Sequence, residues 1–463
     1  MSNSPLPDDT IAAIATAAGR GAVAVVRVSG PQAREVLRRV APAAADAAPR
    51  VQRLAAIRHP ETGELLDRAL VTLFPAPGSY TGEDTGEIST HGGALTPQLV
   101  LGALLAAGAR PALPGEFTRR AYLNGKLDLL QAEAVADLID GRSPALHRAA
   151  VHQMERGLSR RIDELRGAII QAESLIAYSI DFPEEDEPPV PPARIRAAAE
   201  AVMGRMDALL ATAPEGELLR EGALTVLAGR PNSGKSSLFN ALLGTERAIV
   251  TEIPGTTRDA LEASVTVDGY PFRLVDTAGL RDTEDRVEGM GIEVARRYLS
   301  AADLVLFCIE AGREPGDDER VFLADRAPNH TLVVRTKADL AATGGADVDG
   351  EAEEAGVMRS VAVAAVAGSG MPALRDALLR MAFGRILGEP GEAPLVTRER
   401  HARALRHARG EVATFVDALD STVPMELAAT HLRAAAGELE DLIGAVSVDD
   451  VLDRVFGDFC VGK

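Results

Sequence analysis

A glycine-rich segment in the middle of the chain has the residue types of a phosphate-binding loop. Residues 229–236 read GRPNSGKS, between an apolar run at 224–228 and an apolar stretch that ends at Leu243. In the pattern G-x-x-x-x-G-K-S/T, the glycines let backbone N–H groups face phosphate oxygens, and the N-terminus of the following helix adds positive potential. Lys235 supplies a compact catalytic charge, and Ser236 offers a hydroxyl to Mg²⁺. The loop residues expected to contact a nucleotide are Asn232, Ser233, Gly234, Lys235, Ser236 and Ser237.

Asp276 follows a second apolar strand, at 272–275, and begins the sequence Asp-Thr-Ala-Gly. An acid at the carboxyl end of a strand can complete the ligand shell of Mg²⁺, and a nearby glycine N–H can contact a γ-phosphate. Asp268 and Gly269 predict a tight hairpin turn before this strand. The nucleotide contacts expected here are Asp276, Thr277, Ala278 and Gly279.

The sequence TKAD at 336–339 follows a third apolar strand, at 331–335, and resembles the guanine-specificity motif Asn-Lys-x-Asp of G proteins. The resemblance implies that Asp339 accepts hydrogen bonds from guanine, which selects GTP over ATP, and that the stem of Lys337 covers the base. Thr336 stands where the motif has Asn, and its hydroxyl can replace only part of the bonding of an amide. The residues that match the remaining guanine contact are Ala364 and Ala365.

Leu280 occupies the position where Ras-like proteins carry a glutamine that orients the attacking water, so another group must do this work. Asn232 together with GTTRD at 255–259 resembles the potassium-dependent G proteins, in which K⁺ replaces an arginine finger worth about 10³–10⁵ in rate. The alternatives are that Asn232 only caps its loop and that GTTRD is a surface turn. The resemblance implies K⁺ ligands Asn232, Thr251, Ile253 and Thr256, Mg²⁺ ligands Ser236 and Thr257, and nucleotide contacts from Thr251, Glu252, Ile253, Pro254, Gly255, Thr256 and Thr257.

The flanking segments resemble one family with this type of GTPase core, the MnmE (TrmE) family of tRNA-modification GTPases. The resemblance extends over nearly the whole chain and is carried by GRGAVAVVRVSG at 19–30, SYTGED at 79–84, residues 110–140 and CVGK at 460–463. In that family a glutamate of the second switch helix orients the catalytic water. Glu288 occupies the matching position, with Glu284 as the nearest rival and a solvated helix-start glutamate as the structural alternative.

The resemblance also implies an N-terminal domain that dimerises and binds a reduced folate, either 5-formyl- or 5,10-methylene-tetrahydrofolate. A carboxylate suits the amide-like edge of a pterin, and cations suit the glutamate tail; the matching residues are Arg27, Glu87, Lys126 and Lys463. The ordinary alternatives are that Arg27 is a strand-end charge, Lys126 a loop tip and Lys463 a chain terminus. All four lysines of the chain lie in the motifs described here, among 49 Lys and Arg residues. Cys460 is either a thiol with a functional role or a buried structural cysteine, whereas Cys308 lies in an apolar strand and is expected in the core.

The elements around these motifs predict an α/β plus α fold. Buried strands are expected at 21–30, 65–74 and 85–90, and helices at 97–109, 126–180, 194–219 and 392–456, with an exposed Pro- and acid-rich loop at 181–192. Alternating strands and helices between 222 and 384 predict a parallel sheet. The predicted domains are an N-terminal folate-binding and dimerisation domain (1–122), a helical domain in two parts (123–221 and 385–463), and an inserted Ras-like P-loop G domain (222–384).

Composition narrows the classes of function. Aromatic residues make up only 3% of 463 residues, with no Trp, which disfavours a base-stacking nucleic-acid platform. A net charge of −19 means that any nucleic-acid partner needs a local basic patch, for which 142–166 and 398–409 are candidates, although a solvated helix face is the favoured interpretation. Two distant cysteines exclude a disulfide framework and favour a reducing cytoplasm. We find no secretory signal and no apolar run of about 18 residues, so no membrane span is expected.

Taken with the resemblance, these observations predict a cytoplasmic, homodimeric, K⁺-activated GTPase. With an FAD-dependent partner of the MnmG (GidA) type, as a heterotetramer, it would add a carboxymethylaminomethyl or aminomethyl group at C5 of the wobble uridine (U34) of certain tRNAs. FAD is not expected on this chain, because no G-x-G-x-x-G follows a strand. The alternative is a regulatory GTPase of ribosome assembly, like Era or Der, which predicts an RNA-binding appendage and no folate site. A P-loop ATPase is disfavoured by Asp339.

Overall fold

A computed structural model of the chain divides it into two compact units, which are described separately. The first unit contains Met1–Ala136 and Glu440–Lys463, and the second contains Asp137–Leu439. The structure describes residues 9–45, 47–181, 191–245, 262–277, 288–340, 351–354, 358–388, 396–421, 423–444, 452, 455–457 and 459–462.

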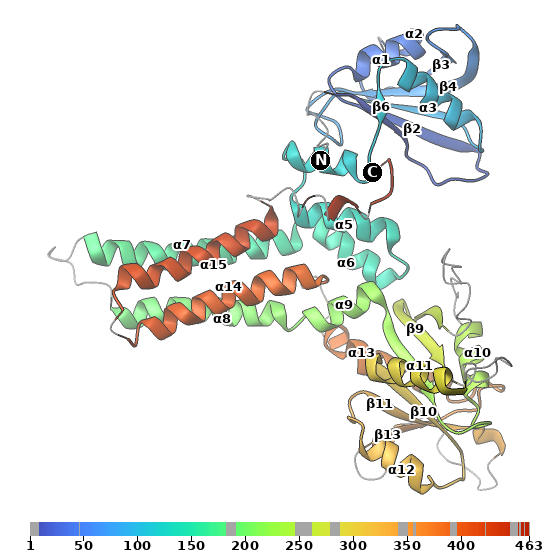
Figure 1. Cartoon of the computed structure of the whole chain (residues 1–463), viewed down its shortest axis with the longest axis vertical. Helices are drawn as coiled ribbons and strands as arrows, with labels where there is room; N and C mark the ends of the chain where they lie inside the picture. Colours follow the sequence, from blue (N-terminus) through green and yellow to red (C-terminus); the bar gives the residue numbers. More distant parts are fainter. Residues whose placement is uncertain are drawn as a thin grey trace. The chain divides into compact units, whose positions relative to one another are not determined.

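The first unit is built on a six-stranded sheet with the order β3-β4-β5-β2-β1-β6 (Figure 1). Neighbouring strands are antiparallel, except that β1 and the short β6 are parallel. Alternate residues of the strands form a core with α1 and α3, in which Leu37 and Leu104 are fully buried. The elements are β1 (Ile11–Ile14), β2 (Val23–Ser29), α1 (Ala33–Val40), α2 (Pro42–Ala45), β3 (Arg53–Arg58), β4 (Leu65–Phe74), β5 (Thr85–His91), α3 (Thr96–Ala106), β6 (Arg110–Pro111), α4 (Glu116–Leu123) and α5 (Leu129–Asp140), the last of which crosses into the second unit.

The C-terminal residues return to this first unit. Pro114 and Val461 form an antiparallel bridge, and the Gly115 N–H donates to the Cys460 carbonyl at 3.3 Å. Gly462 has a φ of +101°, and a Cβ there would lie 2.5 Å from the carbonyl oxygen of Ile14. The chain end is therefore fixed against β1 and the loop before α4, which a longer side chain at position 462 would prevent.

In the sequence, long helices of the second unit come both before and after the strands of its sheet. Figure 1 shows α7, α8, α14 and α15 as a bundle of long helices, and α8 has contacts with both α7 and α14. The predicted helix at 194–219 is interrupted at Ala211 and Thr212, because Pro214 in the first turn of α9 has no N–H to donate to the Leu210 carbonyl. The elements are α6 (Pro144–Met154), α7 (Gly157–Asp181), α8 (Pro192–Leu210), α9 (Ala213–Glu221), α14 (Glu399–Ala418) and α15 (Met425–Ile443).

The sheet of the second unit has seven strands in the order β12-β13-β11-β10-β7-β9-β8. β7 pairs in parallel with β9 on one side and with β10 on the other. The chain therefore adds strands first on one side of β7 and then on the other, which makes the carboxyl end of β7 a topological switch point. Ligands of open α/β sheets bind at such a switch point. The elements are β7 (Ala223–Ala228), α10 (Lys235–Thr245), β8 (Glu262–Val267), β9 (Tyr270–Asp276), α11 (Glu288–Ala301), β10 (Leu304–Glu310), α12 (Asp317–Ala324), β11 (Thr331–Thr336), η2 (Ala338–Leu340), β12 (Glu351–Glu354), β13 (Met358–Ala362) and α13 (Met371–Gly388).

Candidate functional site

The predicted phosphate loop connects the buried strand β7 to α10 at this switch point. Gly229 has a φ of +138°, and a Cβ there would lie 2.4 Å from the Cys308 carbonyl oxygen of β10. Gly234 has a φ of +86° and faces the side chain of Thr336. Asn232 also adopts a left-handed conformation, with a φ of 63°, which asparagine tolerates better than most residues. The glycines are therefore required both by backbone conformation and by the closeness of β10 and β11.

Lys235 lies inside the loop. Its side chain is almost fully buried, and its Nζ donates to the carbonyl oxygens of Gly229 at 3.0 Å and Arg230 at 2.7 Å. An ammonium held by neutral carbonyls can exchange them for phosphate oxygens, which are stronger acceptors. The lysine is thus placed for a phosphate ligand.

Ser236 and Asp276 meet at the mouth of the loop. The Ser236 Oγ donates to Asp276 Oδ2 at 2.8 Å, which joins the start of α10 to the end of β9. A hydroxyl and a carboxylate beside a triphosphate are the kind of oxygen donors that Mg²⁺ prefers, so the residues fit this ion. The Thr277 hydroxyl, by contrast, donates to the Leu227 carbonyl at 2.8 Å and holds two strands together.

The guanine-type motif lies beside the same loop. The buried hydroxyl of Thr336 donates to the Ser233 carbonyl at 2.7 Å, so this residue supports the phosphate loop. Lys337 has a φ of 55° and pairs with Glu310, while Asp339 is exposed in η2. The Ala338 N–H donates to the Val363 carbonyl at 3.1 Å, which joins the motif to the segment after β13. That segment contains Ala364, which is buried, and Ala365, which is half-buried.

Several predicted ligands lie outside the described residues. These are Thr251, Glu252, Ile253, Pro254, Gly255, Thr256, Thr257, Ala278, Gly279 and Lys463. Glu288 is the first residue of α11, but its side chain is also outside the described part. Of the predicted K⁺ ligands, the structure therefore describes only Asn232.

Sequence reasoning missed a support beneath the loop. Glu319, in the first turn of α12, is 4% exposed and accepts two hydrogen bonds from Arg313, at 2.8 and 2.6 Å. Those bonds hold the pKa of Glu319 below its ordinary value, and the Gly316 N–H donates to the same carboxylate. Arg230 of the phosphate loop lies 3.5 Å from it, so the cluster ties the loop to α12. The signal in the sequence is the spacing Gly316-Asp-Asp-Glu319, which is typical of a helix start with an acid at its third position.

In the first unit, Arg27 and Glu87 are directly opposite one another on β2 and β5. The Arg27 Nε donates to Glu87 Oε1 at 2.9 Å, and the guanidinium lies 5.6 Å from the ring centroids of both Tyr80 and Phe117. Within the described part of the chain, the buried Nη1 of Arg27 has no hydrogen-bond partner. An unpaired buried donor beside a carboxylate and two aromatic rings fits a planar polar ligand such as a pterin.

The other residues predicted for the folate site have different surroundings. Lys126 is exposed and donates to the Pro77 carbonyl at 3.0 Å. Cys460 is exposed, so the alternative of a buried structural cysteine is wrong. Cys308 is fully buried in β10, as predicted, and burial raises its pKa to about 12.

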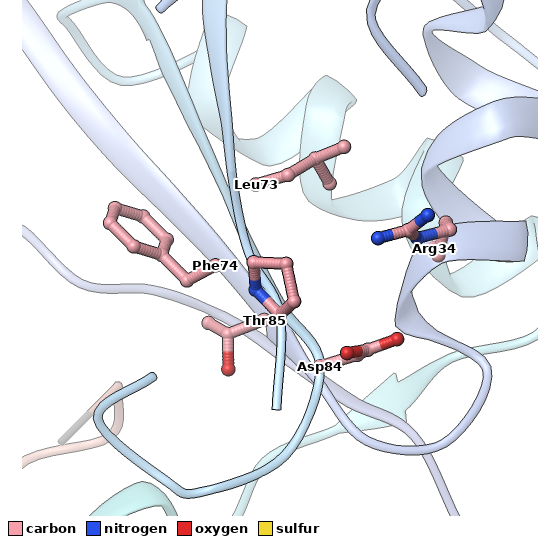
Figure 2. A pocket seen from close by; sticks show the side chains of 6 residues that line it. Arg34, Leu73, Phe74, Asp84 and Thr85 are labelled. Carbon is pink, nitrogen blue, oxygen red and sulfur yellow. The ribbon is translucent and has the colours of Figure 1, made fainter. Parts of the chain in front are cut away.

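A small pocket of the first unit lies between α1 and the ends of β4 and β5. Figure 2 shows Arg34 and Asp84 on one side of it and Phe74 on the other. Its lining contains none of the residues predicted to bind folate; it consists of Arg34, Leu73, Phe74, Pro75, Asp84 and Thr85.

The arginine-rich helices considered as tRNA contacts are extensively ion-paired. Arg406 pairs with Glu399 at 2.9 Å, and Arg409 with Asp207 at 2.8 Å. Arg161 pairs with the neighbouring Glu164 of α7. These pairs favour the interpretation of solvated helix faces, since acids beside the arginines lower the local positive potential.

Two family models match the chain. One is described as GTP-binding protein TrmE N-terminus and matches residues 10–126, and the other, the MnmE helical domain, matches residues 129–460. The chain belongs to the MnmE family. A relative from Geobacter metallireducens, named tRNA modification GTPase MnmE, is 41% identical over 98% of this chain and 99% of its own length. A relative of the same name from Azoarcus sp. (strain BH72) is 42% identical over 100% of both chains.

The two family models confirm the predicted fold class of an α/β N-terminal part and a helical part. The phosphate loop follows a strand of the seven-stranded sheet, as predicted for the inserted α/β part. Among solved structures, the G domain of the FeoB iron transporter of T. maritima is 27% identical and covers 34% of this chain and 97% of its own length. Its TM-score of 0.25 is too low to support any inference. Among the described residues, no helix is both long and apolar enough to span a membrane.

Proposed function

We propose that this chain hydrolyses GTP as part of tRNA modification, the activity for which its relatives are named. The observation that supports the proposal best is the Ser236–Asp276 hydrogen bond, since a hydroxyl and a carboxylate at the mouth of the phosphate loop are oxygen donors that suit Mg²⁺. The loop lies at the switch point of the sheet, next to the exposed Asp339. These features favour a guanine nucleotide as the ligand.

Each described residue then has a defined task. Lys235 leaves the carbonyls of Gly229 and Arg230 and binds the β- and γ-phosphates. Ser236 and Asp276 would hold Mg²⁺, which would supply positive charge beside the phosphate oxygens. Asp339 accepts hydrogen bonds from guanine and so disfavours ATP.

We also propose that K⁺ activates the reaction. Its ligands would be Asn232, Thr251, Ile253 and Thr256, and Thr257 would join Ser236 on Mg²⁺. Asn232 supports this idea, because it lies in the phosphate loop and its side-chain amide oxygen is a suitable ligand for a cation. Glu288, at the start of α11, would orient the attacking water.

The first unit would bind a reduced folate, with Arg27 and Glu87 on the pterin and Lys126 and Lys463 on the glutamate tail. The unpaired buried donor of Arg27 supports this assignment. Cys460 is exposed and fixed near β1, and it remains a candidate for a thiol role. The chain would act in the cytoplasm as a homodimer, and with an FAD-dependent partner of the MnmG type would modify C5 of U34. The three domains, whose four segments meet at residues 122, 221 and 384, are part of the same proposal.

The test is GTP turnover of the purified chain in KCl and in NaCl. We expect turnover to be about 10-fold or more slower in NaCl, since K⁺ supplies charge that Na⁺ does not place as well. Asp276→Asn should lower turnover by about 100-fold in either salt because it weakens the Mg²⁺ site. Asp376→Asn, the same change at an exposed position of α13, should have no effect. Equal rates in both salts would remove K⁺ from the mechanism, and an active Asp276→Asn variant would remove the Mg²⁺ assignment.

A further inference from the structure

One carboxylate of α9 holds a kink in α13, the helix that leaves the seven-stranded sheet. Phe383 has non-helical angles, with φ −132° and ψ 23°. The backbone N–H groups of Arg385 and Ile386, just after it, donate to the two oxygens of Glu215 at 2.9 and 2.7 Å. A kink frees N–H groups from the helix, and a buried or half-buried N–H needs another acceptor. Glu215 therefore stabilises this particular break.

Further bonds join the segment that enters the sheet to the segment that leaves it. Arg385 Nη1 donates to the Ala211 carbonyl at 3.0 Å, and the Val396 N–H donates to Thr212 Oγ1 at 3.0 Å. A Cβ on Gly216 would lie 2.2 Å from the Val396 carbonyl oxygen, so the two backbones touch. The incoming and outgoing segments are therefore joined by hydrogen bonds and by close backbone packing.

β9 contacts this junction. The fully buried ring of Phe383 lies 4.9 Å from the ring of Tyr270 and 5.6 Å from that of Phe272, the latter edge to face. The carboxyl end of the same strand is Asp276, which is bonded to Ser236 of the phosphate loop. A strand of seven residues therefore connects the nucleotide site to the kink, a distance of about 20 Å.

The turn before β9 has a second contact with the helices. The Gly269 carbonyl accepts a hydrogen bond of 3.0 Å from the Ala145 N–H in the first turn of α6, an N–H that has no partner within its own helix. Ala145 and Leu219 are buried in the same hydrophobic cluster as Phe272 and Phe383. Figure 1 shows α9 and α13 meeting beside β9 at this place. The sheet and these helices thus share one core, and close-packed cores transmit displacements.

We propose that β9 and its turn couple occupancy of the nucleotide site to α6 and to the kinked half of α13, with Glu215 holding the kink in register. The inference rests on the proposed GTP site. Asp276 would shift when its bond to Ser236 is exchanged for a bound nucleotide and Mg²⁺, and β9 would pass that shift to Phe383 and Gly269. The helices then respond to the nucleotide without contacting it.

Amide hydrogen exchange of the full-length chain tests this coupling. We compare the free chain with the chain bound to GDP, or to GDP with aluminium fluoride, and follow peptides covering 144–154 and 384–388. In the wild type we expect nucleotide to change exchange in both segments. In Glu215→Ala, residues 384–388 should exchange about tenfold faster and lose their response to nucleotide, because two hydrogen bonds to a charged acceptor are gone.

A fluorescent GDP analogue, titrated in parallel, separates failure of coupling from failure of binding. Glu217→Ala, an exposed change on the same helix, is the matched control and should behave as the wild type. Glu215→Gln keeps one acceptor oxygen and should be intermediate, which maintains the test if the alanine variant does not fold. Bound nucleotide with no change at either segment in the wild type, or a normal response in Glu215→Ala, would overturn the coupling. Failure of the wild type to bind the analogue would overturn the proposed GTP site itself.

Discussion

At the scale of single residues, the hydroxyl of Thr336 determines which part of the candidate nucleotide site this residue contacts. The guanine-type motif has asparagine here, with a donor and an acceptor, whereas threonine offers one hydroxyl. That hydroxyl donates to the Ser233 carbonyl at 2.7 Å in a buried position. Thr336 therefore supports the phosphate loop, and Asp339 is the described residue that we propose for recognition of the base.

Thr336→Val tests this assignment. The change removes the hydroxyl at constant shape and leaves the buried Ser233 carbonyl without its donor, which costs about 1–3 kcal/mol. We expect GDP to bind about tenfold more weakly and IDP, which lacks the exocyclic amine, to weaken by the same factor. Thr336→Ser should bind as the wild type does. A change in the ratio of GDP to IDP affinity, measured by competition, would instead place Thr336 on the base.

The sequence predicted residues whose function follows from a local pattern. Lys235, Ser236 and Asp276 follow strands at fixed spacing, and the structure brings them together. The role of Arg230 was not predictable, because its partner Glu319 lies on a helix far along the chain. Such pairings depend on sheet order, which no local pattern contains.

At the scale of elements, α4 is positioned by an ion-pair network. Glu116 is 2% exposed and accepts bonds from Arg110, at 2.9 and 2.6 Å, and from Arg120. Burial alone would raise the pKa of Glu116, but the bonds from Arg110 hold that pKa below its ordinary value of 4.5. The helix carries Phe117, which lies beside Arg27, so the network supports the candidate folate site.

Glu116→Gln should destabilise α4 by about 3 kcal/mol at pH 7, because it leaves the arginines without a buried counter-charge. The folded pKa is depressed, so the contribution of Glu116 is present above pH 4.5 and is lost as pH falls through the folded value. The difference between variant and wild type should therefore shrink below pH 4.5. Amide exchange of residues 116–123 measures it, with the exposed Glu35→Gln as control. If the difference in exchange between Glu116→Gln and the wild type did not change with pH, the charge of Glu116 would not be what stabilises α4.

The positions of helices and strands were largely predictable where apolar residues recur in the sequence with a clear period. The strand predicted at 65–74 is β4 with the same bounds, because the apolar residues Ala69–Val71, Leu73 and Phe74 dominate its second half and Pro75 follows it. The helix predicted at 194–219 divides into α8 and α9, since its apolar period continues across the break before Pro214. The kink at Phe383 was not predicted, because it depends on Glu215, which is far from it in sequence.

At the scale of the whole molecule, the proposed nucleotide site lies in the second unit and the proposed folate site lies in the first. The two family models match the N-terminal part and the helical part of this one chain. The full-length relatives are named for tRNA modification. Hydrolysis in the second unit would therefore serve chemistry elsewhere in the assembly. A GTPase that regulates ribosome assembly would have the same phosphate loop but would not modify tRNA. Activity on tRNA therefore distinguishes the proposed function from that alternative.

The most direct test is nucleoside analysis of tRNA from a strain that lacks this chain. We predict that the modified wobble uridine disappears, returns when the wild-type chain is supplied, and does not return with the Asp276→Asn variant, because modification depends on the Mg²⁺ site. Unchanged wobble uridine in the strain lacking the chain, or full restoration by Asp276→Asn, would contradict the account.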